Sequence, residues 1–192
     1  MSAPTARAAV SSVLALFAEH GSGAYVGEAV SQEEHGTQAA AHAAACGSPP
    51  HVICAALLHD VGHMLALRDP TLPRMGALGA VRHEALGAAW LASLGFPPAL
   101  TTLVARHVDA KRYLCARDPA YAAKLSEASR GTLAWQGGPM NEAQVREFED
   151  SGLLDVVLRM RTWDEAAKTP GRRVRPLAEY AEMLEALVEG AR

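Results

Sequence analysis

The chain has 192 residues, of which 49% are hydrophobic and 20% are charged, and its net charge at pH 7 is −3. This length suits one domain with a core of its own, so we expect a single domain over residues 1–192. The lack of a basic excess argues against a nucleic-acid-binding surface. No apolar run is long enough to cross a membrane, and the sequence does not predict an oligomeric state.

Three cysteines, Cys46, Cys54 and Cys115, form no CxxC pattern. We therefore expect neither a disulfide framework nor a thiolate metal site. The interpretation that follows is a cytoplasmic protein in which these cysteines are small buried side chains.

Helical periodicity runs along the whole chain, and no alternating run of strand type interrupts it. The first segment, "ARAAVSSVLALFAEH", places Val10, Val13, Leu14 and Phe17 at helical spacing, which predicts an amphipathic helix rather than a signal peptide. Segments rich in Pro and Gly break the pattern further along. We expect an all-α bundle of about seven or eight helices.

The segment "AALLHDVGHMLAL" (55–67) is apolar at both ends and carries His59, Asp60 and His63 in its middle. Interpreted as one core helix, it puts the two histidines on the same face with Asp60 beside them. A buried carboxylate next to buried imidazoles is costly unless a partner satisfies them. A divalent metal ion is such a partner, because it binds neutral imidazole and ionised carboxylate together.

Groups of the same chemistry lie on other expected helices. His35 in "SQEEHGTQAA" precedes the central pair, His83 in "VRHEALGAAWL" and His107 in "LVARHVDAKRYL" follow it, and Asp164 in "RTWDEAAK" comes last. Ligands on facing helices can converge in the core of a bundle. The sequence therefore predicts a metal site built from several helices.

The order His, His-Asp, His, His, Asp resembles the HD-domain superfamily, an all-helical fold with metal ions in the core of the bundle. Most of its members resemble phosphohydrolases. A small branch, which includes inositol oxygenase and bacterial phosphonate-cleaving oxygenases, uses a mixed-valent di-iron pair and O2. The chain resembles the phosphonate-cleaving group over nearly its whole length, in the segments "YVGEAVSQEEH" (25–35), "AALLHDVGH" (55–63), "HVDAKRYL" (107–114), "LSEASRGTLAWQGGPM" (125–140) and "RTWDE" (161–165).

This resemblance implies a dinuclear site of two iron ions, Fe(II) and Fe(III), with molecular oxygen as cosubstrate. The first iron would be held by His35, His59 and Asp164, the second by His83 and His107, and Asp60 would bridge both. Nitrogen and oxygen ligands also suit manganese, zinc and nickel, so ligand type alone does not select the metal.

The reaction implied is oxidative cleavage of the carbon–phosphorus bond of a small-molecule phosphonate. The substrate would be a 1-hydroxy-2-aminoethylphosphonate or its trimethylammonium analogue. The products would be phosphate and glycine or an N-methylated glycine such as glycine betaine.

The resemblance assigns phosphonate binding to five residues, and a phosphonate dianion needs such cations and hydrogen-bond donors. Two of them sit one helical turn from an expected ligand, since Lys111 follows His107 by four residues and Arg161 precedes Asp164 by three. We expect Asp60 and His63 to be the catalytic residues. The five phosphonate-binding residues are His63, Lys111, Ser129, Thr132 and Arg161.

Tyr25 and Glu28 lie three residues apart before the first expected ligand. In relatives within this group such a pair senses the amine of the substrate. A carboxylate pairs with an ammonium, and an aromatic ring attracts a quaternary nitrogen. The sequence leaves open whether the two residues serve a primary ammonium or a trimethylammonium group.

Two other functions remain open at this stage. A metal-dependent HD phosphohydrolase acting on a nucleotide or phosphomonoester needs no redox metal and works without O2. However, aromatic residues make up only 5% of the chain, so no obvious set is available to stack on a base. A non-catalytic HD module would tend to have lost ligands, and here every expected ligand is present.

Overall fold

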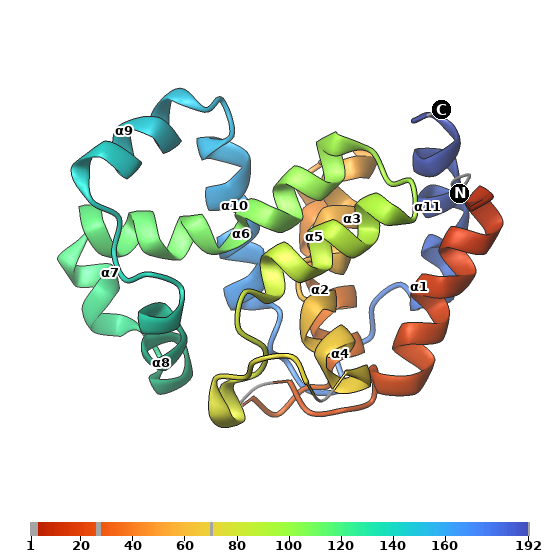
Figure 1. The fold of residues 1–192 in the computed structure, drawn as a ribbon, viewed down its shortest axis with the longest axis horizontal. Helices are drawn as coiled ribbons and strands as arrows, with labels where there is room; N and C mark the ends of the chain where they lie inside the picture. The colour runs from red at the N-terminus through yellow and green to blue at the C-terminus, as the bar shows by residue number, and fades with distance from the viewer. Residues whose placement is uncertain (1–3, 26–27, 70, 192) are drawn as a thin grey trace.

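The computed structural model describes residues 4–25, 28–69 and 71–191, which form helices without any strand (Figure 1). The expectation of an all-α fold is therefore confirmed. The elements are α1 (Ala6–His20), α2 (Gln32–Ala45), α3 (Pro50–Leu58), α4 (Val61–Arg68), η1 (Gly76–Leu78), α5 (His83–Ser93), α6 (Pro98–Arg117), α7 (Pro119–Lys124), α8 (Glu127–Trp135), α9 (Glu142–Asp150), α10 (Leu154–Ala166), η2 (Leu177–Tyr180) and α11 (Ala181–Glu189), where η marks a 3-10 helix.

The expected number of helices was too low, because short helices follow one another with little separation. Asp118 ends α6, and its side chain accepts a hydrogen bond from Ala120 N at the start of α7.

The start of α2 is set by local hydrogen bonds between side chains and backbone. The Ser31 hydroxyl accepts from Glu34 N, and the Glu34 carboxylate accepts from Ser31 N, which is a capping box.

The central segment is not one helix, contrary to the sequence interpretation. Helix α3 ends at Leu58 and α4 begins at Val61, with a bend of 43° between them. His59 and Asp60 occupy the break, and Asp60 has φ −105° and ψ 10°, outside the helical region. The break, and not helical spacing, therefore sets the direction of these two side chains.

One hydrophobic core joins most of the helices. Helix α3 packs on α2 and α6, α5 packs on α4 and α6, and α10 packs on α2 and α6. Helices α1 and α11 pair at one end of the molecule, and α7, α8 and α9 lie at the other (Figure 1). The helices that carry the expected ligands therefore meet in the middle.

The cysteines correspond only in part to the expectation of buried side chains. Cys54 is buried in α3 and Cys115 is half-buried, but Cys46 is exposed. The prediction was wrong for Cys46 because this residue ends α2, where the chain turns outward through Gly47 at φ 67°. All three are free thiols.

Within the described ranges, no single helix is long and apolar enough to cross a membrane. Helices α3 and α4 meet the criteria of length and composition only as a bent pair. Most of their side chains are buried in the core.

Gly62 is the position at which α4 touches the start of α5. A Cβ atom built on Gly62 would lie 1.9 Å from the carbonyl oxygen of His83. We expect Gly62→Ala to lower the free energy of unfolding by roughly 1–3 kcal/mol, because the two helices must move apart. Urea denaturation of the metal-free protein measures this. Gly190→Ala is the control, since its Cβ would lie 3.3 Å from its nearest neighbour; equal losses in both variants would contradict the close approach.

Candidate metal centre and adjoining pocket

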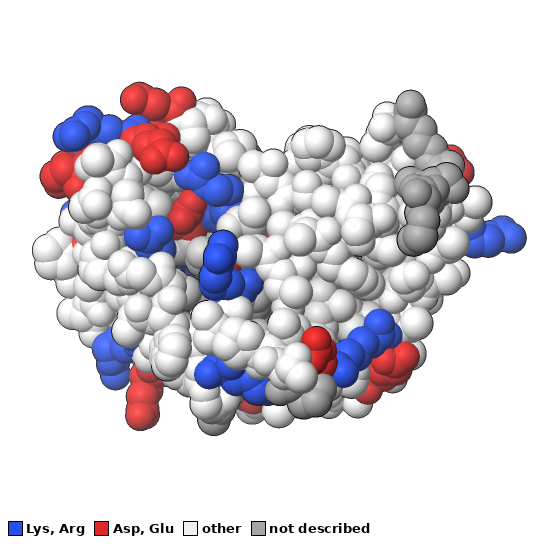
Figure 2. All heavy atoms as spheres, in the orientation of Figure 1, with Lys and Arg blue, Asp and Glu red and all other residues white. Residues whose placement is uncertain are grey.

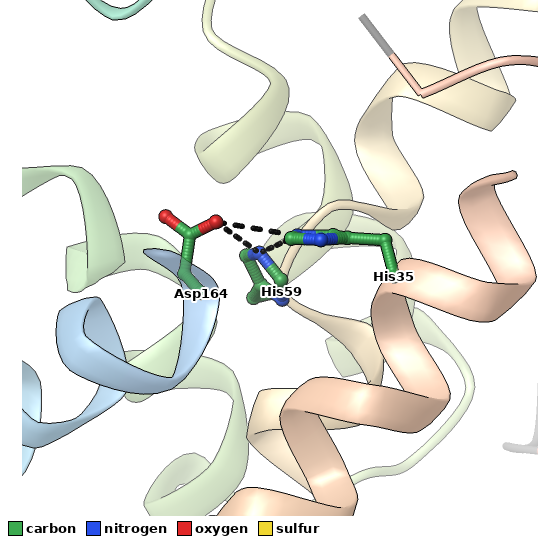
Figure 3. Close-up of side chains that lie close together, drawn as sticks. All are labelled: His35, His59 and Asp164. Atoms are coloured by element: carbon green, nitrogen blue, oxygen red, sulfur yellow. Dashed lines mark hydrogen bonds and ion pairs between the residues drawn. The ribbon is translucent and has the colours of Figure 1, made fainter. Parts of the chain in front are cut away.

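His35, His59 and Asp164 form the first cluster. They come from α2, from the break before α4 and from α10, and their side chains point toward one another (Figure 3). The His35 and His59 Nε2 atoms are 3.2 Å apart. Asp164 Oδ1 lies 3.3 Å from His35 Nε2 and 3.9 Å from His59 Nε2. All three residues are buried.

His83 and His107 form a second cluster with Asp60. His83 is the first residue of α5 and His107 lies in the middle of α6. Their Nε2 atoms are 3.1 Å apart, and each lies close to Asp60 Oδ1, at 3.2 and 3.4 Å respectively. Both rings are buried.

Asp60 divides its two carboxylate oxygens between the clusters. Oδ1 faces His83 and His107, whereas Oδ2 lies 3.3 Å from His59 Nε2 and 3.7 Å from His35 Nε2. Two ligand atoms each about 2.1 Å from one metal ion are roughly 3–3.5 Å apart at octahedral or tetrahedral angles. All spacings of the second cluster lie in this range, and those around the first cluster lie in it except for two longer ones, His59 Nε2–Asp164 Oδ1 at 3.9 Å and His35 Nε2–Asp60 Oδ2 at 3.7 Å. The donor set therefore fits two metal ions that share Asp60.

Hydrogen bonds on the far side of three rings fix their tautomers. Nδ1 of His35 lies 3.0 Å from Ala167 O, Nδ1 of His59 lies 2.8 Å from Ala56 O, and Nδ1 of His107 lies 2.7 Å from Val104 O. A carbonyl oxygen only accepts, so each Nδ1 carries the proton. In the neutral ring each Nε2 then presents a lone pair to the cluster, as a metal requires. Nδ1 of His83 has the Glu84 carboxylate at 3.5 Å.

Mutual attraction keeps the buried carboxylates ionised. Burial acts to raise the pKa of Asp60, but His59, His107 and His83 hold it well below its usual range. The pKa of Asp164 is likewise lowered against the effect of burial, chiefly by Arg161 and His35. Burial opposes the charged form of His59, yet Asp60 and Asp164 raise its pKa to about 9. Metal binding at neutral pH would therefore displace a proton from the cluster.

A pocket opens beside Asp60, His83 and His107 and brings together the residues that the sequence analysis assigned to substrate. His35 and His59 lie behind it and do not line it. Its lining includes the seven residues Tyr25, Glu28, His63, Lys111, Ser129, Thr132 and Arg161, and also Asp164. On the face drawn in Figure 2, basic side chains gather where the α7–α9 end meets the rest of the molecule.

Two cations of this pocket are held by named partners. Lys111 Nζ donates to Thr132 Oγ1 at 2.6 Å and to Ser129 O at 3.3 Å. Arg161 Nη1 donates to Asp164 Oδ2 at 2.7 Å, which leaves Asp164 Oδ1 directed at the histidines. Arg161 thus orients a candidate ligand as well as lining the pocket.

His63 differs from the other buried histidines in its hydrogen bond. Its Nδ1 accepts from Ala80 N at 3.0 Å, and its ring stacks on His83 at 3.9 Å. Burial, aided by His83, lowers the pKa of His63 to about 3. The neutral ring must then carry its proton on Nε2, so it can donate a hydrogen bond but offers no free lone pair. Gly79 permits this packing, since a Cβ there would lie 2.4 Å from His63 Nδ1.

The sequence analysis missed three residues of the site. Lys168 lines the pocket and pairs with Glu28, Gln136 lines it with a buried Oε1 that has no hydrogen-bond partner, and Glu84 faces His83 Nδ1. Lys168 follows Asp164 by four residues, the spacing by which Lys111 was found after His107. Gln136 lies in the quoted "QGGPM" segment but carried no signal of its own.

Taken together, the fold and the site define an all-helical protein with a buried histidine–aspartate cluster that can hold metal ions. No protein-family model matches the chain. It is 38% identical over 179 residues to the glycine-betaine-forming 1-hydroxy-2-(trimethylamino)ethylphosphonate dioxygenase of Leisingera caerulea, across 91% of this chain and 87% of that protein.

Two further relatives cover similar shares. The hydroxymethylphosphonate dioxygenase of Gimesia maris is 38% identical over 180 residues, across 94% of this chain and 88% of the relative. An uncharacterised protein of Acanthamoeba polyphaga mimivirus is 36% identical over 175 residues, across 91% and 80%. The chain therefore belongs to the family of phosphonate dioxygenases that the two named enzymes represent.

Lys111 gives a test of this pocket that needs no substrate. Its side chain is buried, and burial together with Arg161 lowers its pKa from 10.5 to about 8. At pH 7 the folded protein must keep a buried ammonium, so we expect Lys111→Met to raise the unfolding free energy of the metal-free protein by about 1–3 kcal/mol.

This gain in unfolding free energy should shrink as pH rises from 8 to 10.5, because over this range the wild-type lysine is neutral in the folded state but still charged in the unfolded state. Denaturation curves at several pH values measure it. Lys124→Met, at an exposed position of α7, is the control. A loss of stability in Lys111→Met at pH 7 would contradict a costly buried charge.

Proposed function

We propose that the chain is a dinuclear iron oxygenase of the HD-domain type that cleaves the carbon–phosphorus bond of a small 1-hydroxyphosphonate with O2. The single observation that carries this proposal is the division of the Asp60 oxygens between two histidine clusters beside a cation-lined pocket. The family of phosphonate dioxygenases supplies the reaction class. We place the enzyme in the cytoplasm, on the absence of a disulfide framework.

In this proposal His35, His59 and Asp164 hold one iron, His83 and His107 hold the other, and Asp60 bridges them. Two irons bound there would take up the phosphonate and hydroxyl oxygens of the substrate and activate O2. The histidine and carboxylate donors suit iron but do not select it over manganese or zinc.

The residues around the cluster bind and orient the phosphonate. Lys111 supplies a buried positive charge, and the Thr132 hydroxyl beside it is within reach of the same anion. His63 donates from Nε2 toward the pocket and acts, with Asp60, at the reacting end of the substrate. Arg161 and Ser129 complete the lining.

The overall reaction balances without an external reductant. A 1-hydroxyphosphonic acid RCH(OH)PO3H2 and one O2 give RCOOH and H3PO4. The carbon that loses both its C–H and its C–P bond is oxidised by four electrons, and O2 accepts the same number. The role of the residues around the cluster is to exclude water and hold the substrate. The burial of the cluster favours the exclusion of water.

The finer part of the proposal concerns the substituent on carbon 2. A 2-amino or 2-trimethylammonium group would lie toward Tyr25 and Glu28, at the part of the pocket lined by neither α6 nor α8. The products would then be phosphate and glycine or glycine betaine.

Phosphate release tests the proposed function. Iron-loaded protein should release phosphate from 1-hydroxy-2-aminoethylphosphonate, its trimethylammonium analogue or hydroxymethylphosphonate in air, but not under argon. Asp60→Asn should lower the rate at least about a hundredfold, since it disturbs both clusters. Asp155→Asn, exposed on α10, is the matched control. Turnover of phosphomonoesters under argon, without oxygen-dependent phosphate, would point to the hydrolase instead.

Metal content separates the two clusters. After iron loading and dialysis, wild type should hold two metal ions per chain by elemental analysis. We expect His83→Ala to keep about one ion, because it removes a ligand of one cluster only, and Asp60→Ala to lose most of both. Equal metal content in Asp60→Ala and His83→Ala would contradict the bridging role.

A further inference from the structure

Lys168 occupies the side of the pocket where a positively charged substituent would bind. Its Nζ lies 2.5 Å from Glu28 Oε1 and 5.9 Å from the centre of the Tyr25 ring. The Tyr25 ring also stacks on His35, with 3.8 Å between the ring centres. Both features that can attract a cationic nitrogen, the carboxylate and the ring, already have a cation of the protein beside them.

The chain around Lys168 is firmly anchored. The carbonyl of Ala167 takes the His35 Nδ1 hydrogen bond, and Thr169 exchanges two hydrogen bonds with Gln38, at 2.8 and 3.1 Å. Gln38 is fully buried in α2. Because hydrogen bonds hold the backbone on both sides of Lys168, the fold directs the Lys168 side chain to this pocket.

The charges in the pocket explain why the Lys168–Glu28 pair affects the binding of a cation. Its lining contains three carboxylates, of which Asp60 and Asp164 face the histidines, so Glu28 is the one directed elsewhere among the described lining residues. A substrate cation must therefore compete with Lys168 for Glu28. The pair is displaceable, since both side chains are about one-quarter exposed and such pairs are weak.

A second pocket can accommodate the Lys168 side chain when it leaves Glu28. It lines a second, adjoining pocket together with Arg161, Ser129 and Glu165. Glu165 is an acceptor there, already contacted by Arg161 at 2.9 Å.

We propose that Lys168 is a specificity-determining residue: it neutralises Glu28 in the free enzyme, and a substrate with a cationic group on carbon 2 must take its place, whereas a substrate without one need not. This inference rests on the proposed function. Lys168 acts through Glu28 and so is a positioning residue, distinct from the groups that contact the phosphonate.

The test compares kcat/KM for phosphate release from hydroxymethylphosphonate with that from the amino and trimethylammonium compounds. Lys168→Met should raise the cationic-to-uncharged ratio about two- to fivefold, the size expected for freeing one partly exposed carboxylate. Lys168→Arg should keep the wild-type ratio, because an arginine can still pair with Glu28. Lys124→Met, on the rim of the second pocket but without contact to Glu28, should also keep it.

A double-mutant cycle isolates the pair. In a Glu28→Gln background, Lys168→Met should raise the ratio clearly less than in the wild-type background, because it then frees the Tyr25 ring but no carboxylate. For Lys168→Met alone, titration calorimetry under argon should show the same shift in the ratio of affinities for cationic and uncharged substrates. The iron content of this variant should match that of wild type. An unchanged ratio in Lys168→Met, or an equal rise in the Glu28→Gln background, would overturn the assignment. If wild type released no oxygen-dependent phosphate from any of the three compounds, the proposed function itself would fail.

Should Lys168→Met not fold, Lys168→Gln carries the same expectation. Glu28→Gln alone provides an independent arm, since it should lower the cationic-to-uncharged ratio. A rise in that variant would also overturn the assignment.

Discussion

The structure depends on one buried carboxylate. Asp60 places one oxygen against His83 and His107 and the other against His59 and His35. An ionised carboxylate in a protein core is unfavourable unless charged partners surround it. Helices α2, α5 and α6 each bring a histidine to this point, and α10 brings Asp164 with Arg161. The packing of these four helices thus brings the histidines, Asp164 and Arg161 together around Asp60.

The hydrogen bonds behind the rings decide what each histidine can do. Three rings give their Nδ1 proton to a backbone carbonyl and so point a lone pair at the cluster. His63 receives a backbone N–H at the same atom and so points a proton at the pocket. His83, on which His63 stacks, belongs to neither kind, because its Nδ1 faces the Glu84 carboxylate. The backbone, through the partner that it offers to Nδ1, therefore distinguishes the candidate ligands His35, His59 and His107 from the hydrogen-bond donor His63.

The sequence predicted the helical class and the residues that meet at the site, because histidines and aspartates on apolar helices are costly to bury unless they gather around a shared partner. It did not predict how they meet. Helical spacing suggested that His59 and His63 share a face, but the chain breaks between α3 and α4, and no Pro or Gly lies at His59 or Asp60 to signal this. Lys168 was missed because an isolated lysine beyond a helix end usually lies in solvent. Only the fold brings it to Glu28, 140 residues away.

The substituent side of the pocket is joined directly to the candidate metal centre. Tyr25 stacks on His35, and burial, together with Asp60 and Asp164, raises the pKa of its hydroxyl, so that the hydroxyl stays protonated. The Glu28 backbone N–H is bonded to the Tyr25 carbonyl at 2.8 Å, and Lys168 follows directly on Ala167, which accepts from His35. Glu28, through Tyr25, and Lys168, through Ala167, are therefore both next to residues that contact the candidate ligand His35. The proposed recognition of the substituent on carbon 2 and the position of the candidate ligand His35 thus depend on neighbouring residues of the chain.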